Sequence, residues 1–307
     1  MRGHPGRQSG AALLLALLAV VLASVLALGL IERSQQGLAR TQALLDGERA
    51  VQLAHGMALL AQDWLANQDM DDPSSALLEG QWSAPFSVPG GTIQGRLLDQ
   101  NARFNLNALA HPDPLEALEA RLQLERLLDL LGLEPRIAVE LADWLDGGAQ
   151  PRPGGAGDAF YAGRQPPYRQ AGTLMVHVSE LRWLRSVDAE VYERLAPHVT
   201  ALPEPVRLFN VHTMDEWVMA SVWTDLSLAD ARRVRLEGPY ASVDQFLAHP
   251  LLANQPDGYQ PALFTRHSRW FLAQARVSAN GLERDYFRLM LRGASGYDFR
   301  WFSQGTH

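Results

Sequence analysis

The feature that most constrains this chain is an uncharged apolar run near its N-terminus. Residues 11–31 carry no charge, and Ser24 is their one polar side chain. A helix of about 20 apolar residues spans a bilayer core, and this run is longer than the apolar core of a typical signal peptide. Arg2 and Arg7 precede it, so the positive-inside rule places the N-terminus in the cytoplasm and the rest outside. We therefore expect one transmembrane helix over 11–31.

Three fates of this segment stay open from the residues alone. The anchor could stay uncut, a signal peptidase could cut near the small residues Ala27 to Gly29, or a peptidase could cut after Gly10 and leave the helix in place. The following segment favours retention of the helix. Apolar side chains recur there at helical spacing until Asp71 and Pro73, which predicts a stem helix over 32–70.

Beyond the stem, the pattern changes twice. Residues 80–110 and 263–304 contain short runs that alternate apolar and polar side chains, as strands do, and Asn280–Gly281 indicates a hairpin turn. One such predicted strand covers 103–107. Residues 111–262 have mainly helical periodicity, interrupted by a Gly- and Pro-rich loop at 147–173. The outline is a stem helix, strands, a long helical insert, and strands again.

Five pieces of the chain occur in a characteristic order: "RQSGAALLLALLAVVLA"; "ARFNLNAL"; "LADWLDGGAQPRPGGAGDAFYAGRQPPY"; "VSELRWLRSVDAEVYERLAPHVTALP" with "FNVHT"; and the alternating C-terminal strands. In this order they resemble the K-type minor pseudopilins of the type II secretion system, and the resemblance covers essentially the whole chain. It implies an α+β fold in which a long N-terminal membrane and stem helix packs on an antiparallel sheet that contains a large inserted α-helical domain. The implied parts are a leader (1–10), a transmembrane helix (11–31), a periplasmic stem (32–70), a sheet (80–110 with 263–304) and a helical insert (111–262).

The resemblance also implies how the N-terminus is processed and what the chain does. A prepilin peptidase would cut after Gly10 and methylate Ala11, which makes Leu15 the fifth mature residue. Ordinary pseudopilins have a glutamate there, which is thought to pair with the amino terminus of the neighbouring subunit in the filament. A buried carboxylate without such a partner is costly. An apolar residue at this position therefore fits a subunit with nothing above it. We expect an inner-membrane protein that caps the pseudopilus tip and helps to initiate its assembly for protein export. Its expected partners are other minor pseudopilins, the prepilin peptidase and the inner-membrane secretion platform.

Three acidic residues cluster around the Gly- and Pro-rich loop, two just before it and one within it. Asp143, Asp146 and Asp158 supply hard carboxylate oxygens of the kind that Ca²⁺ prefers, and family members are similar in binding calcium here. This sequence departs from the family pattern, because Gly147, Gly148 and Gly157 stand where acids are often found. We expect a calcium site with reduced affinity, and the alternative is that the three acids are solvated helix-end residues.

Two other functions are weighed against secretion. The paired helical segments resemble helix-hairpin-helix modules, which would make the chain a membrane-anchored DNA-binding or DNA-uptake protein. However, residues 175–253 contain eleven acidic residues and seven arginines, and the whole chain has a net charge of −7, which opposes phosphate binding. An anchored periplasmic hydrolase is the second alternative. The chain has no cysteine, and its histidines lack the spacing of a metal-binding motif. His177, His198 and His212 could lie close together in the folded chain, but lone histidines are more often structural or surface residues. We therefore expect no catalysis.

Overall fold

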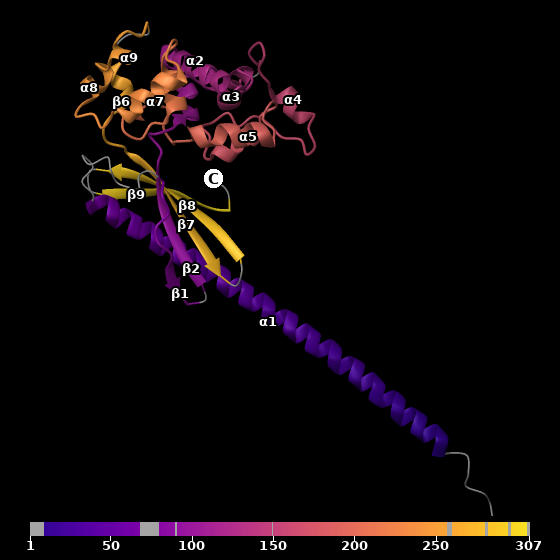
Figure 1. Cartoon of the computed structure of the whole chain (residues 1–307). Coiled ribbons are helices and arrows are strands. Elements are labelled where there is room, and N and C mark those ends of the chain that lie inside the picture. The colour runs from indigo at the N-terminus through magenta and orange to yellow at the C-terminus, as the bar shows by residue number, and fades with distance from the viewer. Residues whose placement is uncertain are drawn as a thin grey trace, which may run out of the picture. The chain divides into compact units, whose positions relative to one another are not determined.

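The computed structural model describes residues 9–67, 80–89, 91–148, 150–256, 260–279, 282–293 and 296–305 (Figure 1). The chain forms two compact units, residues 1–53 and residues 54–307, and each is considered by itself. The predicted hairpin turn at Asn280–Gly281 lies outside the described residues, as do residues 1–8 of the predicted leader.

Helix α1 (Ser9–Asn67) is a single uninterrupted α-helix of 59 residues. Its first half is rich in Ala and Leu, which have high intrinsic helix propensity, and Gly29 and Gly37 have no neighbouring atoms that a side chain would meet. The described helix reaches Asn67, within the predicted stem over 32–70. The expectation of a long N-terminal helix is therefore confirmed.

A five-stranded antiparallel sheet follows, with the strand order β1-β2-β7-β8-β9. The strands are β1 (Phe86–Val88), β2 (Gly91–Asp99), β7 (Trp270–Ala279), β8 (Leu282–Gly293) and β9 (Gly296–Gln304). Strand β2 pairs with β7 from Gly91↔Ala279 to Asp99↔Phe271, so segments far apart in sequence lie side by side. The expected α+β class with an antiparallel sheet is confirmed.

The two faces of the sheet bury different side chains, because residues alternate between the faces along each strand. One face packs on the C-terminal end of α1, where the shared cluster is Leu65, Leu97, Phe271, Ala273, Met290 and Tyr297. The other face contributes Trp270, Leu272, Phe287 and Leu289 to a second cluster, together with Leu202 from the helical region. The first face is thus covered by α1, and the second face is covered next to Leu202, where this second cluster lies.

Between β2 and β7 the chain is mainly helical, and Figure 1 shows α2–α9 gathered together. The helices are α2 (Pro114–Leu130), α3 (Arg136–Asp146), α4 (Asp158–Ala162), α5 (Ala189–Leu195), α6 (Glu216–Val222), α7 (Leu228–Leu236), α8 (Val243–Leu247) and α9 (Pro250–Ala253), with 3₁₀ helices η1 (Leu106–Ala110), η2 (Val178–Trp183), η3 (Ala196–His198) and η4 (Pro261–Leu263). Their apolar faces form one large core that includes Leu124, Leu141, Trp223 and Phe246.

Four very short strands sit among these helices and join no part of the large sheet. Strands β3 (Phe104–Asn105) and β4 (Val199–Thr200) form one parallel pair, and β5 (Phe209–Asn210) and β6 (Phe264–Thr265) form another. The predicted strand over 103–107 is therefore wrong at Arg103 and beyond Asn105. The Asn105 side chain accepts a hydrogen bond from the Asn107 backbone N–H at 3.2 Å and starts η1, which ends the extended conformation.

Candidate functional site

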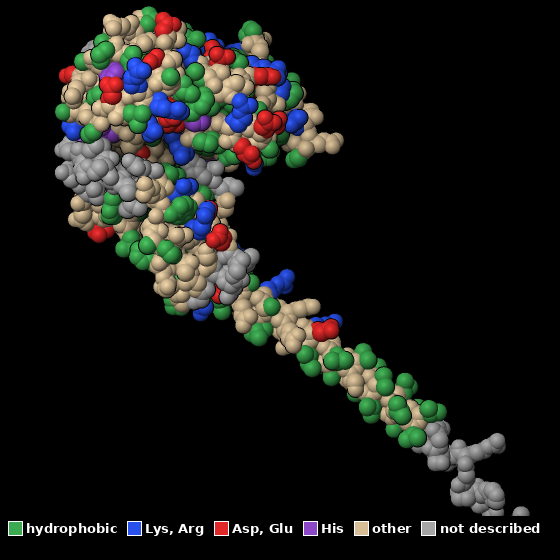
Figure 2. Space-filling model, viewed as in Figure 1, with side chains coloured by type: hydrophobic (Ala, Val, Ile, Leu, Met, Phe, Trp, Pro, Cys, Tyr) green, Lys and Arg blue, Asp and Glu red, His purple; other side chains and the backbone are tan. Residues whose placement is uncertain are grey.

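The first candidate feature is the apolar surface of α1. Every large apolar side chain from Leu13 to Ile31 is more than half exposed, and Leu15, the predicted fifth mature residue, is 67 % exposed. Figure 2 shows hydrophobic side chains along this part of the helix. By length and composition, α1 is the one helix among the described residues that could cross a membrane. Exposing each such side chain to water costs about 1.5–3 kcal/mol, so the surface needs a bilayer or partner helices.

The predicted processing pair lies at the start of this helix. Gly10 and Ala11 follow Ser9, the first residue of α1. The cleavage after Gly10 and the methylation of Ala11 stay predictions.

The second candidate feature is the loop over 147–173, whose two ends meet at its base. Gly147 ends α3 with a φ of 63°, which favours glycine, and a Cβ there would lie 2.6 Å from the Cα of Gly172. The backbone N–H of Gly172 donates to the carbonyl of Trp144 at 3.0 Å. The loop therefore leaves α3 and returns to it.

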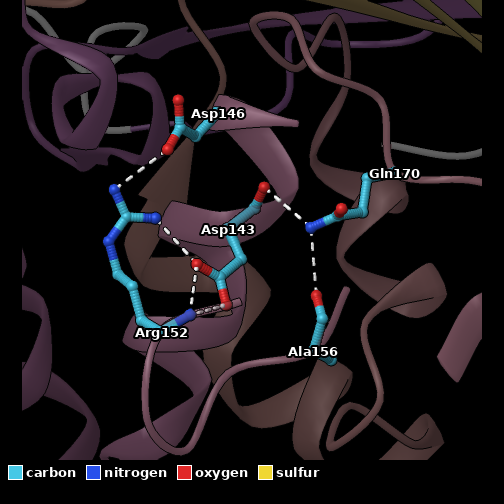
Figure 3. A network of polar contacts seen from close by, with 5 residues as sticks. All are labelled: Asp143, Asp146, Arg152, Ala156 and Gln170. Atoms are coloured by element: carbon cyan, nitrogen blue, oxygen red, sulfur yellow. Dashed lines mark hydrogen bonds and ion pairs between the residues drawn. The ribbon is translucent and has the colours of Figure 1, made fainter. Parts of the chain in front are cut away.

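The three predicted calcium ligands are divided between two sets of contacts. Asp143 is only 3 % exposed, and both its carboxylate oxygens accept hydrogen bonds from Arg152 (Figure 3). Asp146, one turn later in α3, pairs with the same guanidinium, at 3.2 Å. Asp158 begins α4 and accepts a hydrogen bond from the backbone N–H of Gln170 at 2.9 Å.

The donor set does not fit a calcium ion. Ca²⁺ takes six to eight oxygen ligands. Here the oxygens of Asp143 face a cation, and the side-chain amide of Gln170 donates to the carbonyls of Asp143 and Ala156, at 2.9 and 3.0 Å. Gln170 Oε1 is buried without a hydrogen-bond partner, but it is a single oxygen. Among the described residues, no group of three acidic or metal-binding side chains could hold a metal ion.

Sequence reasoning missed Arg152, although the signal was present. Arg152 is the one cationic residue between Asp146 and Asp158. The sequence does not show that this arginine contacts Asp143, because the loop must first turn back before a residue nine positions later can reach the carboxylate.

A second buried carboxylate ties the loop to the following segment. Glu140 of α3 is fully buried, and its Oε1 accepts from Arg185 Nε at 2.9 Å and from Ser186 Oγ at 2.7 Å. Arg185 Nη2 also donates to the carbonyl of Gly154 at 2.8 Å. One arginine thus compensates a buried charge and holds the loop backbone.

Aromatic rings fill the space between the loop and α3. Tyr161 lies edge-on to Trp144, with ring centroids 5.4 Å apart, and Tyr168 is 5.2 Å from Tyr161 and 5.0 Å from Trp183. Burial, followed by the negative charge of Glu140, raises the pKa of Tyr161, so its hydroxyl stays neutral. The loop is therefore packed against α3 through these aromatic rings and does not extend into solvent.

Two of the three candidate histidines, His177 and His198, make different contacts. His177 caps η2 and contacts the ring of Trp301, at 5.3 Å between centroids. His198 pairs with Asp215 at 2.8 Å instead. Among the residues that the structure describes, no cluster of histidine and acidic side chains is arranged to hold a metal ion.

Comparison with known proteins gives one consistent family. The family model described as "Type II secretion system (T2SS), protein K" matches residues 102–204. The chain is 34 % identical over 288 residues to type II secretion system protein K of Klebsiella pneumoniae, covering 88 % of each chain. It is 35 % identical over 253 residues to that of Aeromonas hydrophila, covering 76 % of each.

A solved structure shows the same fold. The chain is similar to a chain in the crystal structure of the GspK-GspI-GspJ complex from the type 2 secretion system of enterotoxigenic Escherichia coli, with a TM-score of 0.73 and 27 % identity. The match covers 87 % of this chain and 100 % of that one. Neither the DNA-binding alternative nor the hydrolase alternative finds support in these relatives.

Proposed function

The chain belongs to the type II secretion system protein K family, and from this premise we propose that it caps the tip of the pseudopilus and helps to initiate its assembly. It is a minor pseudopilin, a structural component of the secretion system.

The observation that carries the proposal is the apolar N-terminal half of α1. Its large apolar side chains are exposed from Leu13 to Ile31. With Ala11 as the first mature residue, Leu15 would take the position at which ordinary pseudopilins carry a glutamate, and an apolar residue there fits a subunit with nothing above it. Before assembly, this surface fits the inner membrane as a single-pass anchor, with the sheet and the helical region in the periplasm. In the filament, the same surface packs against neighbouring helices, where apolar contact replaces lipid.

The partners follow from the related complex. That complex joins GspK with GspI and GspJ, and we infer that this chain assembles with the two corresponding minor pseudopilins of its own system. The prepilin peptidase would process it at Gly10, and the inner-membrane platform would receive the assembled tip. Mass spectrometry of the mature N-terminus tests the processing step: a chain that starts at N-methylated Ala11 supports it, and a start near Leu30 contradicts it.

Labelling at a single position tests the tip assignment. The chain has no cysteine, so an Arg169→Cys variant carries a unique thiol on the exposed surface of the loop. Pseudopili assembled with this variant are treated with a thiol-reactive gold label, with the cysteine-free protein as the matched control. Label at one end of each filament supports capping, whereas label along the shaft would exclude it.

A further inference from the structure

We propose that the guanidinium of Arg152 takes the place of a divalent cation in this chain and holds the 147–173 loop on α3 without a metal ion. The proposal concerns how the loop is stabilised and is independent of the tip function. It accounts for the disagreement between the predicted calcium ligands and the contacts they make.

The first step is the pairing of Asp143. A carboxylate that is 3 % exposed needs several donors or a positive partner, because burial otherwise strongly disfavours its charge. Arg152 supplies both: its backbone N–H lies 3.2 and 3.1 Å from the two carboxylate oxygens, and Nη1 lies 2.7 Å from Oδ1 (Figure 3). One residue therefore neutralises the charge and satisfies both oxygens.

The second step is that the same guanidinium bridges two acids. Its Nη2 lies 3.2 Å from Oδ2 of Asp146, which follows Asp143 by one helical turn. Both acids lie in the last turn of α3, where the helix dipole disfavours negative charge and favours a cation. A planar guanidinium with several N–H groups can serve two carboxylates at once. This is the bridging role that a divalent cation would otherwise have.

The third step is that the carboxylate and carbonyl oxygens of Asp143 are already engaged, and Gln170 Oε1 is the buried oxygen beside them that has no hydrogen-bond partner. A Cβ on Gly155 would lie 1.7 Å from Asp143 Oδ2, so the loop backbone lies directly against that oxygen. On the other side, Gln170 donates to the carbonyls of Asp143 and Ala156, which ties the C-terminal part of the loop to α3 and to the middle of the loop. A metal ion would have to displace Arg152 and Gln170 before it could coordinate these oxygens.

Hydrogen exchange tests the proposal on the full-length protein in detergent. Peptides over 147–173 are followed by mass spectrometry in about 5 mM Ca²⁺ and in excess EGTA, since weak extracellular calcium modules bind at about 0.1–1 mM. We expect the wild-type loop to exchange equally in both conditions. In Arg152→Gln the loop should exchange at least about tenfold faster in both, because charge-assisted hydrogen bonds to Asp143 and Asp146 are lost.

Two variants make the comparison specific. Arg169→Gln removes a charge from an exposed position of the same loop and should leave exchange unchanged. Arg152→Lys keeps the positive charge but loses the planar set of guanidinium N–H donors, so the loop should exchange at a rate between those of the wild type and Arg152→Gln. Calcium-dependent protection of the wild-type loop would overturn the proposal, and so would an Arg152→Gln loop as protected as the wild type. If Arg152→Gln does not fold, the wild-type comparison with and without calcium still decides.

Discussion

Removal of Arg185 should leave a buried charge without its partner. Glu140 is fully buried and its cation is Arg185, whose side chain is 29 % exposed. Truncating one member of a buried ion pair costs about 3–5 kcal/mol. Water can reach the Arg185 side of the pair, and Ser186 still donates two hydrogen bonds to the carboxylate, so we expect Arg185→Met to cost about 3 kcal/mol.

The measurement is urea unfolding of the full-length protein in detergent, followed by tryptophan fluorescence. A loss of about 3 kcal/mol corresponds to a fall of roughly 6–12 °C in the melting temperature of a unit of this size. The matched control is Arg232→Met, because Arg232 is 58 % exposed and forms a surface pair with Glu216 that should contribute less than about 1 kcal/mol.

A double variant separates charge burial from lost packing. Glu140→Gln combined with Arg185→Met removes the uncompensated charge, so the pair of changes should cost less than Arg185→Met alone. The reasoning is refuted if Arg185→Met costs no more than the surface control, or if the double variant is less stable than the single one.

Three further changes test other parts of the structure. Gly155→Ala should cost about 2 kcal/mol in urea unfolding because its Cβ would collide with Asp143, whereas Gly163→Ala, whose nearest atom is 3.4 Å away, should be nearly neutral. Asn107→Ala should cost about 3 kcal/mol, because the fully buried amide makes three hydrogen bonds to backbone groups; equal melting temperatures would contradict this. Burial raises the pKa of the Asp99 carboxyl, so the folded protein binds a proton more tightly than the unfolded chain does. The stability that this group contributes is complete below the ordinary carboxyl pKa and is lost as the pH rises through the folded-state pKa. Asp99→Asn should abolish this loss, so the unfolding free energy of the wild type should fall relative to the variant as pH increases; parallel pH profiles would exclude a raised pKa.

The large elements were predictable because each depends on a repeated local pattern. The run over 11–31 and the periodicity after it specify one long helix, and the alternation over 263–304 specifies strands. Strand β3 was overestimated, since the cap made by Asn105 depends on a single side chain. Sequence spacing alone does not reveal such a choice between strand and turn.

The contacts of the loop were predictable only in part. Asp143 and Asp146 lie one turn apart on α3, and their proximity follows from helix geometry. Asp158 meets Gln170 instead of these acids, and Arg152 reaches α3 only because the loop folds back at Gly147 and Gly172. These contacts depend on tertiary packing, which the acidic residues by themselves do not encode.

The pairing of β2 with β7 has a consequence for the order of folding. About 170 residues separate the end of β2 from the start of β7, so the sheet cannot close until the helical region has been synthesised. Loop-closure entropy grows with the length of a flexible segment, but a segment that has already folded brings its ends together. The helical region, which has its own core, can thus act as a folded tether that presents β7 to β2. Mutations in that core should slow the formation of a sheet that they do not touch.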